Sequence, residues 1–190
     1  MDHSRDSVLT DRALAVRAER IDTDAWFDQW AAAPATVRQA LGLDAFHRGD
    51  LRMVRSHVPF SHFNMVLTLG CPAAADEAAF AAIDDFYAGR DRTPHWVLVN
   101  DHSQPADLTD TLRRRGYAEA GSWDRVVLQG QRPQAWAAHA QGCEAVTDAN
   151  AGEWSRFLLD CYGMPPIIGV WLHALVGRPG WIHVLRRQGG

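Results

Sequence analysis

The strongest constraint on the fold is a strand-like segment followed closely by a helix and a second strand. In residues 63–69, apolar side chains occupy every second position, which is the period of a β-strand. A helix is predicted from Asp76 to Gly89, with large apolar side chains at i, i+3 and i+7. Residues 96–99 are continuously apolar, as in a strand that helices cover on both faces. We therefore expect the strands at 63–69 and 96–99 to pair in parallel, with the helix connecting them.

A further helix and strand are predicted after this unit. Ser103 is expected to begin a helix that ends at Gly116. Residues 123–129 are expected to form a final strand that could pair antiparallel with the sheet.

The segment before residue 63 is less regular. Thr23 or Asp24 is expected to cap a helix that is interrupted near Pro34, and a short strand is predicted at residues 51–55. Residues 1–21 fit either a helix or a strand, and both alternatives remain open.

The pattern of strand and helix begins again in the C-terminal part of the chain. Residues 131–142 are predicted to form a linker and residues 143–146 a short strand. Asn150 and Glu153 then resemble a capping pair at the start of a helix. The expected apolar stripe of this helix consists of Trp154, Phe157, Leu158 and Cys161. A second helix and a strand at residues 181–185 complete the pattern.

Together these elements predict an α/β or α+β fold. We expect a mixed sheet flanked by helices, followed by an incomplete second unit of the same kind. The predicted domains are residues 1–130 and 143–190, joined by the linker at 131–142. Because the chain stops soon after its last predicted strand, the second domain is expected to be unfinished.

The composition argues against several classes of partner. The 190-residue chain has a net charge of −4, and its 19 basic residues are all arginines. They are scattered except at residues 113–115, so we expect no nucleic-acid partner. No apolar run approaches the roughly 20 residues that span a bilayer, and no signal sequence follows Met1. We expect a cytoplasmic protein with no membrane partner. Without lysine, no Schiff base can form on a side-chain amine.

The histidines and cysteines predict neither a metal site nor a nucleophile. None of the nine histidines has the spacing of paired metal ligands, so no metal site is predicted. The three cysteines, Cys71, Cys143 and Cys161, lie far apart in the chain and are expected to be free, buried thiols.

The order of elements and the turns between them resemble a known family. The first unit has a helix stop at Arg115-Gly116-Tyr117 before its last strand. The second unit has two conspicuous turns, Tyr162-Gly163-Met164-Pro165-Pro166 and Gly177-Arg178-Pro179-Gly180-Trp181. On these features the chain resembles the N-acetyltransferase (GNAT) superfamily, in particular bacterial members with two such domains in tandem. Residues 63–129 are similar to the later half of one domain, and residues 143–190 to the first half of the next, truncated within that domain.

This resemblance implies acyl transfer from acetyl-CoA, or another acyl-CoA, to a small-molecule amine. The family holds the CoA pyrophosphate on backbone N–H groups of a loop Gln/Arg-x-x-Gly-x-Gly/Ala, directly after the central strand and at the start of a helix. The corresponding segment here is Gly70-Cys71-Pro72-Ala73-Ala74-Ala75. Its glycine spacing differs and Pro72 has no N–H, so the CoA pyrophosphate loop is missing. We expect acetyl-CoA to bind weakly or not at all.

Two groups of residues are candidates for a substrate site. In the family, the turn between the first two helices shapes the acceptor pocket. The resemblance therefore implies substrate binding by Tyr162, Met164, Pro165 and Trp171. A capped turn that covers the core is the alternative interpretation of this turn. A second possible site lies at the carboxyl end of a predicted strand, where sites in open α/β sheets often lie, and consists of Asn100, Asp101 and His102. A helix-capping loop is the alternative interpretation of these three residues. No catalytic base can be assigned.

A second class of function, a non-catalytic binding or assembly module, is also open. The strand predicted at residues 181–185 lacks its hairpin partner, so its edge is expected to be exposed. Apolar side chains of the same unit are expected to be incompletely covered, namely Trp154, Phe157, Trp171 and Leu175. We therefore expect a homo-oligomer, or a complementing chain, that associates through residues 143–190.

Overall fold

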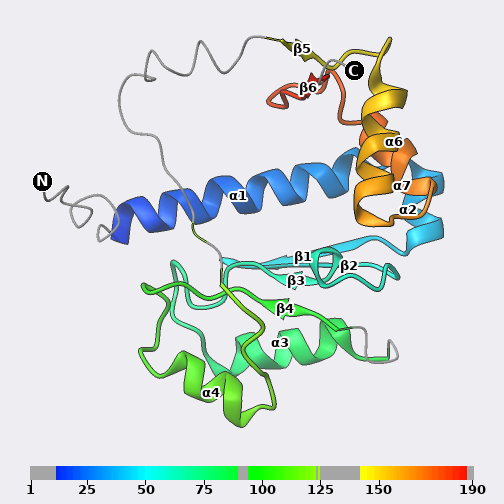
Figure 1. Cartoon of the computed structure of the whole chain (residues 1–190). Coiled ribbons are helices and arrows are strands. Elements are labelled where there is room, and N and C mark those ends of the chain that lie inside the picture. Colours follow the sequence, from blue (N-terminus) through cyan, green and yellow to red (C-terminus); the bar gives the residue numbers. More distant parts are fainter. Residues whose placement is uncertain (1–11, 90–93, 123, 125–141, 188–190) are drawn as a thin grey trace, which may run out of the picture. The chain divides into compact units, whose positions relative to one another are not determined.

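The structure, a computed structural model, describes residues 12–89, 94–122, 124 and 142–187 (Figure 1). The chain divides into two compact units. Unit 1 comprises Met1–Trp30 with Leu41–Arg125, and unit 2 comprises Ala31–Ala40 with Val126–Gly190. The described residues form a mixed α+β structure with six α-helices and six short strands. The coarse fold class predicted from the sequence is therefore confirmed.

Unit 1 contains a four-stranded mixed sheet in the order β1-β2-β3-β4. Its strands are β1 (Asp44–Arg48), β2 (Leu51–Arg55), β3 (Met65–Val66) and β4 (Trp96–Val97). The β1–β2 and β2–β3 pairs are antiparallel, whereas β3 and β4 pair in parallel. The predicted parallel pairing is confirmed, although each of these two strands is shorter than predicted. The strand predicted at 51–55 is confirmed as β2.

The sequence did not predict β1. A two-residue turn joins it to β2, and Gly49 in this turn has φ +57°, the left-handed conformation that such hairpin turns require. The strand was missed because only one of its five side chains is large and apolar, so the usual alternation is absent.

The helix that connects β3 to β4 is α3 (Glu77–Tyr87). The carboxylate of Asp76 caps it by accepting a hydrogen bond from the Ala79 N–H at 2.7 Å. This agrees with the predicted start. The next helix, α4 (Leu108–Arg114), begins later than the predicted Ser103.

One continuous helix, α1 (Arg12–Ala32), includes residues 12–21 of the segment that the sequence left ambiguous. The predicted start at Thr23 or Asp24 is wrong. The buried side of α1 carries Glu19, Thr23 and Trp30, and because two of these are polar the sequence shows no apolar period there. The predicted interruption near Pro34 is confirmed, and α2 (Ala35–Leu41) follows it.

In unit 1 the helices cover both faces of the sheet, with α1 on one side and α3 and α4 on the other (Figure 1). The buried cluster between the sheet and α3 and α4 consists of Leu51, Met53, Val66, Leu69, Phe80, Ala82, Ile83, Phe86, Leu108 and Leu112. Leu67 is fully buried but does not belong to this cluster. Successive strand residues face opposite sides, so Leu67, which follows Val66, lies on the α1 side of the sheet.

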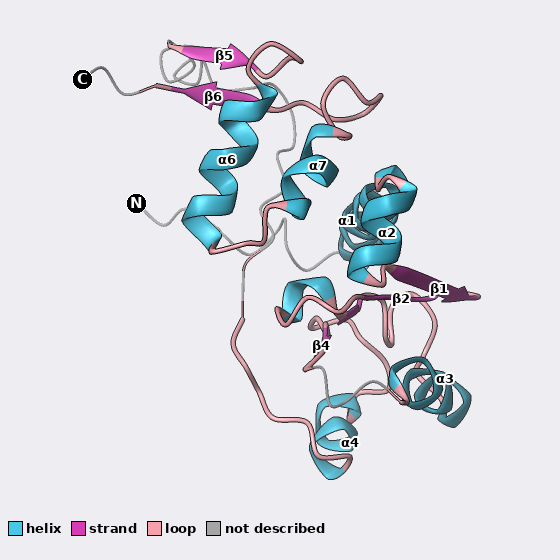
Figure 2. Cartoon of the chain, turned by 90° about the vertical axis from the view of Figure 1, so that its right-hand side faces the viewer, coloured by secondary structure: helices cyan, strands magenta, loops and turns pink. Residues whose placement is uncertain are grey.

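Unit 2 contains a two-stranded antiparallel sheet of β5 (Cys143–Ala145) and β6 (Val184–Arg186). Two helices stand between these strands in the sequence, α6 (Ala151–Tyr162) and α7 (Ile167–His173), seen next to each other in Figure 2. All four elements were predicted, but β6 begins three residues later than expected. The predicted capping pair does not form, because the Asn150 side chain instead accepts from the Thr147 N–H.

The burial of side chains in unit 2 corrects several expectations. Trp154, Trp171 and Leu175 are buried, whereas Phe157 of the predicted stripe is 57% exposed. Cys143 and Cys161 are also exposed, and only Cys71 is a buried thiol. Fewer side chains of α6 are buried than its apolar stripe predicts, because the sheet that α6 covers has only two short strands among the described residues.

Some predictions fall outside the described residues. These are the strand at 123–129, apart from Asp124, and the linker at 131–142, apart from Gly142. No helix in the described part of the chain is long and apolar enough to cross a membrane.

Candidate functional site

The carboxyl ends of β3 and β4 form the most informative region of unit 1. Because these strands are parallel, the loops that follow them leave the same edge of the sheet. One loop leads into α3 and corresponds to the expected donor loop, and the other carries the candidate residues at 100–102.

The second loop is a tight, internally bonded turn. The Asn100 N–H donates to Ser103 Oγ at 3.0 Å, and the Ser103 N–H donates back to the Asn100 carbonyl at 2.9 Å. The His102 N–H donates to Asn100 Oδ1 at 2.8 Å. The three candidate residues therefore lie together, and Asn100 holds the turn.

Asn100 also connects this turn to α1. Its Nδ2 donates to Glu19 Oε2 at 3.2 Å, and Glu19 is only 4% exposed. Glu19 could not be predicted from the sequence, because a lone carboxylate in a helix without an apolar period gives no signal of burial.

The two loops are joined by backbone hydrogen bonds. The Gln104 N–H donates to the Gly70 carbonyl at 2.8 Å, and the Ala75 N–H donates to the Gln104 carbonyl at 2.8 Å. Gly70 has φ +80°, and a Cβ there would lie 2.6 Å from the Gln104 carbonyl oxygen. A glycine is therefore required for this close approach.

The residues of the first loop do not fit a CoA pyrophosphate. Such a group needs free N–H groups and a positive potential at the start of the helix. Here the Asp76 carboxylate accepts from the Ala79 N–H, and the Ala75 N–H is bonded to Gln104. Pro72 has no N–H, and the Glu77 carboxylate accepts from Arg115 Nη2 at 2.6 Å. The N–H groups that a pyrophosphate would need are therefore absent or already bonded at Pro72, Ala75 and Ala79.

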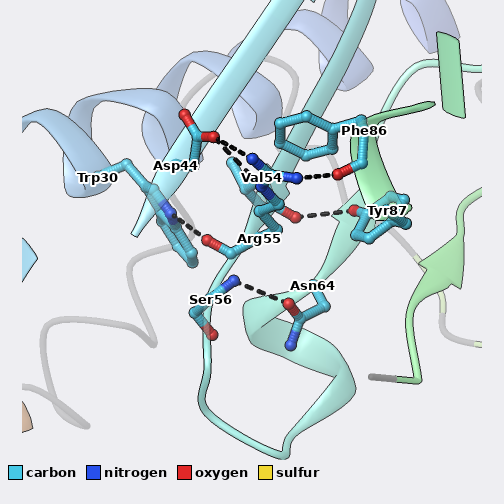
Figure 3. Close-up of polar contacts among 8 residues, drawn as sticks. All are labelled: Trp30, Asp44, Val54, Arg55, Ser56, Asn64, Phe86 and Tyr87. Carbon is cyan, nitrogen blue, oxygen red and sulfur yellow. Dashed lines mark hydrogen bonds and ion pairs between the residues drawn. The ribbon is translucent and has the colours of Figure 1, made fainter. Parts of the chain in front are cut away.

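An arginine organises the opposite part of unit 1 (Figure 3). Arg55 donates to Asp44 Oδ2 through Nη2 at 2.7 Å and through Nε at 3.2 Å. It also donates to the Phe86 carbonyl at the end of α3, and its guanidinium lies 4.4 Å from the centre of the Phe86 ring. These contacts link β1, β2 and α3, beside an open hollow lined in part by Phe46, Arg48 and Asp85.

Two further polar side chains, Asn64 and Tyr87, support this region (Figure 3). Buried Asn64 accepts from the Ser56 N–H at 2.8 Å and donates to the Val58 carbonyl at 3.0 Å, which fixes the loop between β2 and β3. The Tyr87 hydroxyl donates to the Val54 carbonyl at 2.8 Å. Burial raises the pKa of Tyr87 well above its ordinary value.

An aromatic group surrounds His95, just before β4. Its ring stacks on Tyr87 with centroids 3.9 Å apart, and its Nε2 lies 2.8 Å from the Tyr117 hydroxyl. Burial also raises the pKa of Tyr117. Because this group precedes β4, it lies away from the carboxyl edge where the loops meet.

In unit 2 the predicted substrate-binding residues do not share one surface. Tyr162 is 63% exposed and Pro165 is also exposed, and the Met164 N–H donates to the Leu159 carbonyl at 2.9 Å in the turn after α6. Trp171 is 1% exposed and belongs to the interior. The only surface formed by these residues is therefore the turn itself.

A hollow of unit 2 lies between α6 and β6 and is lined in part by Phe157, Val184 and Arg187. Arg187 donates to Glu153 Oε2 at 2.6 Å, and this hydrogen bond holds the pKa of the Glu153 carboxyl below its ordinary value. Arg187 also donates to Glu144. The ion pairs connect β6 to α6 and to β5.

Comparison with known proteins identifies no relative. No protein-family model matches the chain, and no curated protein or solved structure matches it at a significant level. Within the described residues, no three His, Cys, Asp or Glu side chains are grouped so that they could hold a metal ion.

Proposed function

We propose that this protein is a tandem GNAT-like acyltransferase homologue, in which unit 1 keeps the fold of the family without its donor site. Unit 1 then acts as a non-catalytic binding or assembly module. Acyl transfer from acyl-CoA to an amine, the function of the family, would require a donor site outside unit 1.

The order of elements in unit 1 supports this proposal. Helix α1 precedes the sheet, and the central strand β3 leads through α3 into a parallel neighbour and then into α4. This is the order of strand, helix, strand and helix that the resemblance implies. Unit 2 has the opening order of such a domain, a strand, two helices and an antiparallel strand.

One observation carries the non-catalytic assignment. Two N–H groups at the start of α3 already have hydrogen-bond acceptors. The Ala79 N–H donates to the Asp76 carboxylate, and the Ala75 N–H donates to the Gln104 carbonyl. An acyl-CoA pyrophosphate would have to displace both contacts to reach these N–H groups. The free energy of binding that this site offers to an acyl-CoA donor is therefore small.

The proposal is tested by calorimetric titration of the whole chain with acetyl-CoA. We expect no saturable heat up to about 1 mM ligand, which corresponds to binding weaker than about −4 kcal/mol. A parallel assay with mixed small amines should give no acetylated product above the rate without protein. A dissociation constant in the low micromolar range, about −7 to −8 kcal/mol, would contradict the proposal.

A further inference from the structure

The outer edge of the unit 1 sheet has a self-complementary sequence. β1 is the first strand in the order β1-β2-β3-β4, so within the described residues its outer side has no neighbouring strand. Its sequence, Asp44-Ala45-Phe46-His47-Arg48, begins with an acid, ends with a base and has an aromatic residue at its centre. Edge strands with open backbone groups are templates for pairing with another strand.

The hydrogen bonds of β2 decide which groups of β1 face outward. The Arg52 carbonyl accepts from the Leu67 N–H at 2.8 Å, so Arg52 directs its backbone groups toward β3. Successive residues of a strand direct these groups to opposite sides, so Met53 bonds toward β1. Phe46, the partner of Met53, therefore uses its backbone groups on β2.

Ala45 and His47 flank Phe46 and consequently direct their N–H and C=O groups away from β2. They are one residue on either side of the strand centre. Consider a second β1 strand that runs antiparallel to the first, with the two Phe46 residues opposite each other. Ala45 of each strand then lies opposite His47 of the other.

We propose that two copies of this chain pair through β1, antiparallel and about a two-fold axis at Phe46. Ala45 then exchanges both backbone hydrogen bonds with His47 of the second copy, and the same pair recurs across the axis. The two sheets continue as one eight-stranded sheet.

Charge complementarity indicates that the strand bound at the outer edge of β1 belongs to a second copy of this chain. The register places Asp44 opposite Arg48 of the second copy, and the symmetry produces this pair twice. Both positions lie in non-hydrogen-bonded pairs, where opposite side chains are closest. Asp44, Phe46 and Arg48 share one face of the strand, so the two ion pairs flank a central pair of aromatic rings.

Contacts inside unit 1 hold both charged side chains in place. Arg55 donates to Oδ2 of Asp44, whose side chain is still 47% exposed. Arg48 donates through Nη2 to the Ala78 carbonyl at 2.5 Å, near the start of α3. Both side chains are thereby ordered before association, which lowers its entropic cost.

Sedimentation velocity of the whole chain tests the inference, over about 1 μM to about 1 mM, a range that covers weak dimers. We expect a reversible monomer–dimer equilibrium. Arg48→Asp places two carboxylates opposite each other and should weaken the dimer about tenfold. The double variant Asp44→Arg with Arg48→Asp restores opposite charges across the axis but loses the contacts with Arg55 and the Ala78 carbonyl. Its dimer should therefore be tighter than that of Arg48→Asp and weaker than that of the unmodified chain. Arg113→Asp, a charge reversal on exposed α4, is the control and should leave the dimer unchanged.

A second variant tests the backbone pairing. His47→Pro removes an outward N–H from the edge and leaves the Phe46 bonds to β2 intact, a position where sheets tolerate proline. We expect a monomer with an unchanged circular-dichroism spectrum. The inference is overturned if the unmodified chain is a monomer throughout, or if the folded proline variant still dimerises. Association that survives His47→Pro and disappears in Val184→Lys would place the interface in unit 2 instead.

Discussion

At the scale of single residues, a few polar side chains do most of the positioning in unit 1. Asn64 holds the loop before β3, and Asn100 holds the turn after β4. Arg55 joins two strands to the end of α3. Each side chain satisfies backbone or charged groups that would otherwise be costly to bury.

The hydroxyl of Tyr87 provides a test at this scale. Tyr87→Phe leaves the Val54 carbonyl without its donor and should lower the free energy of unfolding by about 1 kcal/mol at pH 8. The raised pKa of Tyr87 means that the native state favours the neutral phenol. Its stabilisation is therefore complete below the ordinary pKa of 10.0 and is lost as the pH rises above that value.

Urea unfolding between pH 8 and pH 11 measures both effects. Above pH 10 the unmodified chain should lose up to about 1.4 kcal/mol per pH unit more than Tyr87→Phe. Tyr162→Phe is the matched control, because that hydroxyl belongs to an exposed side chain. Parallel stability curves for the unmodified chain and Tyr87→Phe would show that burial does not control this ionisation.

At the scale of elements, backbone hydrogen bonds join the two loops at the carboxyl edge of the sheet. The segment around Gln104 bonds to both ends of the loop that enters α3. Helix α4 begins at Leu108, after this segment. The Ala75 N–H is therefore bonded through the contact between the two loops.

Gly70 tests this joint structure. Gly70→Ala brings a Cβ within 2.6 Å of the Gln104 carbonyl oxygen, in addition to the cost of a positive φ. Gly89→Ala carries a similar φ of +71° with no atom within 4 Å of the added carbon. The Gly89 change should cost about 1–2 kcal/mol, and the Gly70 change about 1–3 kcal/mol more. Equal losses in urea unfolding would show that the loops can separate freely.

At the scale of the whole molecule, the chain has two compact units with separate buried clusters. The larger cluster lies in unit 1 between the sheet and its helices. The smaller one, in unit 2, is centred on Val146, Ala151 and Trp154. Because the two clusters share no residue, the units are expected to unfold in separate transitions.

Scanning calorimetry of two truncation variants tests this expectation. Leu112→Ala should lower only one midpoint, with a loss of about 2–4 kcal/mol, because Leu112 belongs to the cluster of unit 1. Trp154→Ala should lower only the other, with a loss of about 3–5 kcal/mol. A single transition that both variants lower would show that the chain unfolds as one cooperative body.

Elements that depend on local pattern could be predicted from the sequence by itself. These are α3 with its Asp76 cap, the parallel pairing of the strands around it, and the helices and strands of unit 2. In each case the period of apolar residues agrees with a start or stop signal nearby, so short-range physics is sufficient.

Only the tertiary structure decided the features that depend on distant partners. β1 is a strand because β2 pairs with it, and α1 is continuous although its buried side carries Glu19 and Thr23. The contact of Asn100 with Glu19 joins residues 81 positions apart. Burial of a polar side chain is set by the group that satisfies it, and a sequence pattern does not reveal where that group will lie.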